Sequence, residues 1–118
     1  MSAGLDPAVL TALREARAAG RRCALATVVG TRGSTPRKVG ARLVLDPVSG
    51  LAGTVGGGCG EAEVLEAARR VLAGAGAHLV RVDLTRDVLS WSPAVCGGIM
   101  EVFVEAVPSD DAGESEPG

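Results

Sequence analysis

The stretch 51–73 reads LAGTVGGGCGEAEVLEAARRVLA, and it indicates the fold class more strongly than any other part of the chain. A short strand is predicted at 51–55, a run of glycines follows, and a helix is predicted at 60–73. The apolar residues of that helix recur at helical spacing, and its glutamates precede its arginines, which complements the helix dipole. Strand, glycine run and helix together point backbone N–H groups at an anion. The apolar helix positions are Val64, Leu65, Ala68, Val71 and Leu72.

The rest of the chain predicts a layered arrangement around one sheet. A first helix begins at Asp6-Pro7, where the carboxylate can cap free N–H groups, and ends at Gly20. The run 23–29 is continuously apolar and suits a strand buried on both faces. Further strands are predicted at 41–46, 79–84 and 99–105. The fold class is therefore α+β, a single domain over residues 1–108 with a mixed sheet of about five strands and two main helices.

Composition restricts the partners. The 118 residues include only two aromatic side chains, Trp91 and Phe103, so there is little scope for stacking on bases. The net charge is −2, but the segment 109–118 carries four acids and no base, which leaves the rest slightly basic. We expect this acidic tail to be disordered. Nucleic acid is not an expected partner.

The chain has no apolar run of membrane-spanning length, and its first residues do not resemble a signal peptide, so we expect a cytoplasmic protein and no membrane partner. Its three cysteines are an odd number and should be reduced thiols. Cys23 begins an apolar run and is interpreted as a small buried hydrophobic residue. With a single histidine and no C-x-x-C motif, a zinc site is not expected.

Three glycine-rich loops, at 30–40, 56–60 and 96–98, each adjoin a predicted strand and can share one edge of the sheet. The first carries cations and hydroxyls, and each of the others carries a cysteine, Cys59 or Cys96. A thiol at a helix N-terminus has a stabilised thiolate, so Cys59 should be the most reactive. No histidine pairs with Ser34, so a hydrolase is not indicated. The alternatives remain open: the glycines are structural turns and the two cysteines fill narrow spaces, or the loops bind an anion that favours sulfur.

Three blocks of sequence resemble the N-terminal domain of the XdhC/CoxI family. They are VVGTRGSTPRKVGA at 28–41, GTVGGGCGE at 53–61 and CGGIMEVFVE at 96–105, in the family's order. The resemblance implies a chaperone, not an enzyme, that binds molybdenum cofactor (molybdopterin) transiently and passes it to xanthine dehydrogenase or a related molybdenum hydroxylase, such as the carbon monoxide dehydrogenase type. No catalytic residue is implied.

The resemblance also implies which residues bind the cofactor. We expect the backbone amides of 56–60, with Arg37 or Lys38, to take the phosphate or the pterin, and Cys59 or Cys96 to face the molybdenum, because thiolates suit soft, sulfur-rich centres. The family's marked positions are Gly33, Ser34, Thr35, Pro36, Gly56, Gly57, Gly58, Cys59, Glu61, Cys96, Gly97 and Gly98.

The implied partners are a molybdenum hydroxylase apo-enzyme, a cysteine desulfurase or sulfurtransferase, and a two-domain XdhC-type protein; we also expect a homodimer, because sheet edges are often shielded by pairing. Two other functions stay open. One is a nucleotide- or NAD(P)-binding redox protein that uses the 53–61 loop, with Asp83 contacting ribose. The other is an interaction module that binds no ligand.

Overall fold

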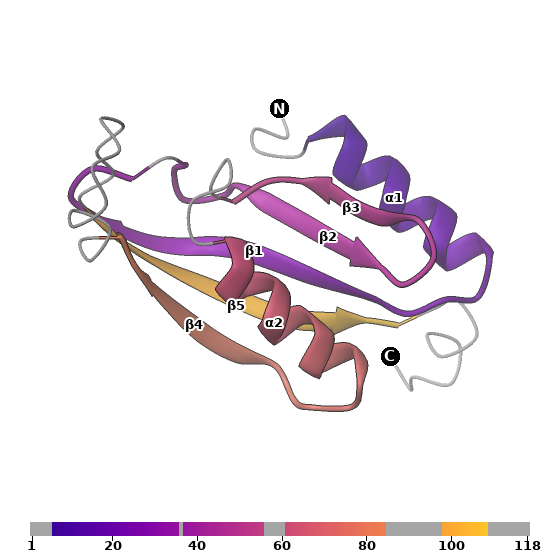
Figure 1. Cartoon of the computed structure of the whole chain (residues 1–118). Coiled ribbons are helices and arrows are strands. Elements are labelled where there is room, and N and C mark those ends of the chain that lie inside the picture. Colours follow the sequence, from indigo (N-terminus) through magenta and orange to yellow (C-terminus); the bar gives the residue numbers. More distant parts are fainter. Residues whose placement is uncertain (1–5, 36, 56–60, 85–97, 109–118) are drawn as a thin grey trace, which may run out of the picture.

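The computed structural model describes residues 6–35, 37–55, 61–84 and 98–108 (Figure 1). These residues form one five-stranded sheet with strand order β3-β2-β1-β5-β4 and two helices. The elements in chain order are α1 (Pro7–Ala18), β1 (Cys23–Arg32), β2 (Arg42–Asp46), β3 (Gly50–Gly53), α2 (Glu61–Leu72), β4 (His78–Asp83) and β5 (Ile99–Val107). The predicted α+β class with five strands and two main helices is confirmed.

Both helices begin and end as the sequence predicts. Asp6 caps α1: its Oδ1 accepts a hydrogen bond of 2.8 Å from the backbone N of Ala8. Gly20, just beyond α1, has a φ of 74°, a left-handed conformation that stops the helix. At the end of α2, Gly74 does the same with a φ of 113°. Neither of these helices is long and apolar enough to cross a membrane.

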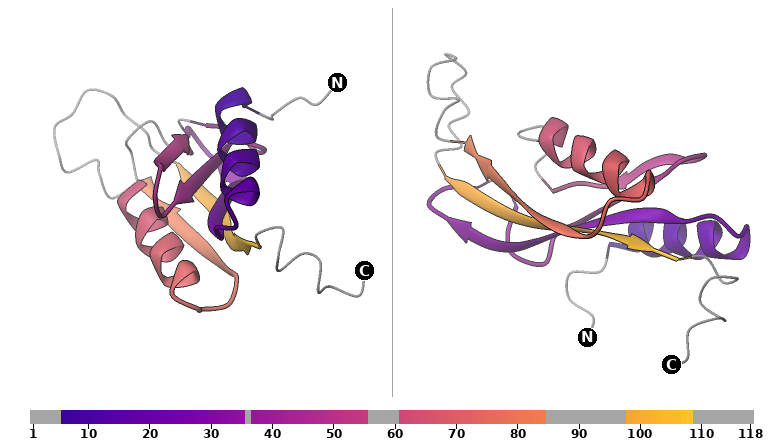
Figure 2. Two further views of the ribbon diagram at one scale, coloured as in Figure 1. Left: turned by 90° about the vertical axis from the view of Figure 1, so that its right-hand side faces the viewer. Right: turned by 90° about the horizontal axis from the view of Figure 1, so that it is seen from below.

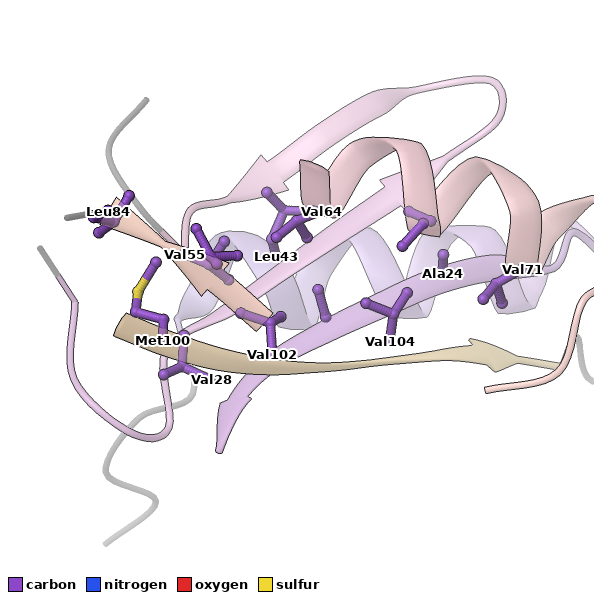
Figure 3. Packing of buried hydrophobic residues seen from close by; sticks show 14 residues of the cluster. Ala24, Val28, Leu43, Val55, Val64, Val71, Leu84, Met100, Val102 and Val104 are labelled. Carbon is purple, nitrogen blue, oxygen red and sulfur yellow. The ribbon is translucent and has the colours of Figure 1, made fainter. Parts of the chain in front are cut away.

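The two helices cover opposite faces of the sheet (Figure 2). Side chains alternate between faces along a strand, so Ala24, Ala26 and Val28 of β1 face α2, while Cys23 packs with α1. Under α2, these residues join a buried cluster to which α2 and the strands β1, β2, β4 and β5 contribute (Figure 3). Besides Val28, its largest members are Leu43, Val55, Val64, Val71, Val82, Leu84, Met100, Val102 and Val104.

Two expectations need correction. The first strand does not stop at residue 29: β1 continues to Arg32, because β5 supplies hydrogen-bonding partners as far as Arg32 opposite Ile99, with a bulge between Val28 and Gly30. The sheet is also not mixed, since every pairing among the described strands is antiparallel. The reason is that α2 carries the chain from one edge of the sheet to the other, so the strands it joins, β3 and β4, are not neighbours.

One partly buried ion pair fastens the segment after α1 to the turn between β2 and β3. The Asp46 side chain is 1% exposed, and its Oδ2 lies 2.8 Å from Nη2 of Arg21 while its Oδ1 accepts from Nε at 3.0 Å. The same Oδ1 accepts from the backbone N of Val48 at 3.1 Å. The hydrogen bond from Arg21 holds the pKa of Asp46 well below its ordinary value, against the opposing effect of burial.

Replacing Asp46→Asn tests this pair. A carboxyl group whose pKa is lowered by folding stabilises the native state above its ordinary pKa of about 3.9 and loses that contribution as the pH falls towards the folded value. We expect the variant to lose about 1.5–3 kcal/mol of unfolding free energy at pH 7 and to show a weaker fall in stability between neutral and acidic pH, as measured by urea denaturation. Asp6→Asn is the control, because asparagine caps a helix as well as aspartate does. A variant with the pH dependence of the original protein would contradict this role.

Candidate functional site

The antiparallel register brings the ends of the three predicted loops to one edge of the sheet. Arg32, at the end of β1, lies opposite Ile99, at the start of β5, and Ile99 also lies opposite Asp83, at the end of β4. On the other side of β1, Gly53 at the end of β3 lies opposite Leu43 of β2. We call this end of the sheet, where β1 ends at Arg32, β3 at Gly53 and β4 at Asp83 and where β5 begins at Ile99, the loop edge. These flanking residues leave their strands towards the same end of the sheet, while residues 56–60 and 96–97 lie outside the described part of the chain, so the sharing of one edge by the three loops stays a prediction.

Gly98 joins the first and third sequence blocks directly. It is buried, and a Cβ atom at this position would lie 2.3 Å from the carbonyl oxygen of Arg32 and 2.7 Å from that of Ser34. The carbonyl of Gly98 accepts a hydrogen bond of 2.9 Å from the backbone N of Leu84. The backbone of the third block thus lies against the backbone of the first, which only glycine allows.

The residues on both sides of the 56–60 glycine run are also tied together. The hydroxyl of Thr54, just after β3, donates to the carboxylate of Glu61, the first residue of α2. Before it, Gly53 has a φ of 79°, and a Cβ there would lie 2.4 Å from the carbonyl oxygen of Arg42. Glu61 therefore positions the start of α2 relative to β3. Thr54 and Gly53 were not among the predicted site residues, because their contacts with Glu61 of α2 and with Arg42 of β2 depend on how these elements pack.

The first loop presents its cations to solvent. Arg37 and Lys38 are exposed, and the hydroxyl of Thr35 donates to the carbonyl of Arg37 at 3.0 Å. Gly33 takes a φ of 70° where the chain leaves β1. The loop is closed by two backbone hydrogen bonds across its base, from Val28 N to Ala41 O at 2.9 Å and from Gly40 N to Val28 O at 2.8 Å. The positive charges of Arg37 and Lys38 are thus carried by a loop whose two ends are joined by backbone hydrogen bonds.

Several predicted site residues lie outside the described part of the chain, and their roles stay predictions. They are Pro36, Gly56, Gly57, Gly58, Cys59, Cys96 and Gly97. Within the described ranges, no group of three or more histidine, cysteine, aspartate or glutamate residues could hold a metal ion. Cys23, which was interpreted as a buried hydrophobic residue, is 1% exposed, and burial raises the pKa of its thiol.

Comparisons with known proteins agree with this architecture. The model of the XdhC and CoxI family matches residues 16–83. The uncharacterized protein YqeB of Escherichia coli K12 is 33% identical over 81 residues, which are 69% of this chain and 15% of YqeB. A crystal structure of a xanthine dehydrogenase from Bacillus halodurans superposes with a TM-score of 0.68 at 28% identity and covers 83% of this chain and 30% of that chain. The chain therefore spans less than a third of the length of either relative.

Gly98→Ala tests the contact between the first and third blocks. The added methyl group must displace two backbone carbonyls, so we expect the unfolding free energy to fall by about 1–3 kcal/mol. Gly76→Ala is the matched control, because nothing lies within 4 Å of a Cβ at that position. Chemical denaturation of both variants gives the comparison. Equal stability of the two would show that the blocks are not packed as described.

Proposed function

The chain belongs to the XdhC and CoxI family, and we propose that it is an accessory protein, not an enzyme, that binds molybdenum cofactor and assists its insertion into a molybdenum hydroxylase such as xanthine dehydrogenase. The observation that carries the proposal is the packing of Gly98 against the carbonyls of Arg32 and Ser34. It holds the first and third family blocks in contact at the loop edge, and the second block ends at Glu61, the first residue of α2.

The described residues fit the chemistry of this cofactor, which has a phosphate, a pterin and a molybdenum centre with sulfur ligands. Arg37 and Lys38 are exposed cations that suit the phosphate. The start of α2, positioned by the Thr54–Glu61 hydrogen bond, favours negative charge through the helix dipole. When bound, the cofactor supplies the redox-active metal that the hydroxylase requires, and the residues of this chain bind and orient it.

The two remaining cysteines would supply thiolates to the molybdenum. In sequence, Cys59 stands two residues before Glu61 and Cys96 two residues before Gly98, and both of those residues are held at the loop edge. Thiolates are ligands that soft or sulfur-rich metal centres prefer. This assignment separates Cys59 and Cys96 from Cys23, which lies at the start of β1, at the opposite end of that strand from the loop edge.

The proposed partners are a two-domain family member and a hydroxylase apo-enzyme that receives the cofactor. A cysteine desulfurase or sulfurtransferase would supply sulfur, and a homodimer is proposed as the assembly. The NAD(P) alternative lacks support, because the described strands pair only in the antiparallel sense and a dinucleotide fold needs parallel strands.

Cofactor content tests the proposal. The full chain is expressed in a host that makes molybdenum cofactor and is purified without oxygen; molybdenum is then measured by mass spectrometry and pterin by the fluorescence of its oxidised form. We expect near-stoichiometric amounts of both, and a severalfold loss of molybdenum in Cys59→Ala and in Cys96→Ala. Cys23→Ala should retain the cofactor, because this residue lies in the cluster beneath α1.

Two results would contradict the proposal in different ways. If the molybdenum content is unchanged in both Cys59→Ala and Cys96→Ala, the two thiols do not bind the metal, but the protein still carries the cofactor. No molybdenum or pterin in the original protein, even after co-expression with a two-domain family member, would contradict cofactor binding and favour an interaction module that binds no ligand.

A further inference from the structure

A pocket of about 150 Å³ lies beside the loop edge, on the face of the sheet opposite α2, and the proposed function does not use it. It is lined by Gly30, Thr31, Arg32, Arg81, Ile99 and Glu101. Glu101 stands between Met100 and Val102 in β5, and both of these neighbours are buried under α2. Because side chains alternate along a strand, Glu101 lies on the other face. The contacts of α1 are with β2 and β3, so this helix does not cover the pocket.

The glycine at position 30 leaves room for the Glu101 carboxylate. A Cβ atom on Gly30 would lie 2.9 Å from Oε1 of Glu101, so this oxygen reaches over the backbone of β1. The bulge between Val28 and Gly30 sets this register, in which Glu101 is paired with Gly30 on one side and with Arg81 of β4 on the other. The carboxylate therefore lines the pocket, and its strand β5 has β1 on one side and β4 on the other.

Two guanidinium groups accompany this carboxylate and leave the pocket with one net positive charge. Arg81 lies directly opposite Glu101, and Arg32 lies two residue pairs further along the sheet, opposite Ile99. Within the part of the chain that the structure describes, no ion pair or hydrogen bond links the side chains of Arg32, Arg81 and Glu101. Their donors and acceptors are therefore available to a ligand.

This combination selects a ligand with two kinds of group. A simple anion would be attracted by the arginines and repelled by Glu101. A simple cation would be attracted by Glu101 and repelled by the arginines. A ligand that presents adjacent N–H donors to the carboxylate and an anionic group to the arginines satisfies all three residues. A cavity of about 150 Å³ accepts one six-membered ring the size of benzene, and Ile99 offers that ring an apolar wall.

We propose that this pocket binds a small anion through an aminopyrimidinone edge, the paired ring N–H and amino group that pterins and guanine share. Glu101 accepts from that edge, and Arg32 and Arg81 hold the anionic group. For a pterin ligand the inference rests on the proposed function and deepens it, since Arg32 and Ile99 adjoin Gly33 and Gly98 of the loop edge. For a guanine nucleotide it stands without the proposed function.

Titration of the purified protein with pterin-6-carboxylate and with GMP tests the proposal. Both probes carry the aminopyrimidinone edge and an anionic group, while AMP and inorganic phosphate lack that edge. We expect at least one of the two probes to bind, and its dissociation constant to rise at least about tenfold in Glu101→Gln, because one acceptor becomes a donor that opposes the N–H groups. Glu105→Gln is the matched control: it lies on the same face of β5 but outside the pocket lining, and should bind as the original protein does.

Comparison of the two probes distinguishes the possible ligands. Tighter binding of pterin-6-carboxylate assigns the pocket to a pterin, and tighter binding of GMP assigns it to a guanine nucleotide. The proposal is overturned if neither probe binds at millimolar concentration, if Glu101→Gln binds as well as the original protein, or if AMP or phosphate binds as tightly as the probes. If the protein binds pterin-6-carboxylate through Glu101 but never carries molybdenum, this inference is supported and the proposed function is contradicted.

Discussion

The antiparallel pairing of β1 with β5 is the constraint on which the rest of the structure depends. It runs from Cys23 opposite Val107 to Arg32 opposite Ile99, through the centre of the sheet. Because this register is fixed, the loop after β1 and the segment before β5 must meet, and Gly98 lies against the carbonyls of Arg32 and Ser34. Two family blocks that are about sixty residues apart in sequence thus become one surface.

The two ends of the sheet differ in structure: one is held together by an ion pair, and the other carries the glycine-rich loops. At the end away from the loop edge, the Arg21–Asp46 pair closes the turn between β2 and β3, and α1 covers the sheet face behind it. At the loop edge, glycines and exposed cations adjoin the strand ends, and the pocket around Glu101 opens on the face that α1 leaves uncovered. Binding loops carried on a rigid scaffold are the usual location of function in small domains. In this fold, the scaffold is the sheet with its two apolar clusters.

The sequence predicted the elements well, because their signals are local. The helix caps at Asp6 and Gly20 and the apolar stripe of α2 were predicted from the sequence, and the structure confirms them. The sequence did not predict how strands pair: β1 extends to Arg32, and all described pairings are antiparallel, because neighbours in space decide both. For the same reason Glu101 and Arg81 were not predicted as site residues, since their common pocket exists only across the β4–β5 register. The positions of Cys59 and Cys96 lie outside the described residues, so their role remains a prediction.

Binding of the cofactor at one end of this sheet is tested most directly by following the backbone amide signals of the protein when the cofactor is added. Uniformly ¹⁵N-labelled protein is compared by nuclear magnetic resonance in its cofactor-free form and after anaerobic addition of molybdenum cofactor released from a molybdenum hydroxylase. If the cofactor binds at the loop edge, the amide signals of Gly33, Thr54 and Gly98 should shift together, while those of Arg21, Ser49 and Gly76, at the other end of the sheet, stay in place. Shifts spread over both ends, or confined to the far end, would contradict binding at the loop edge.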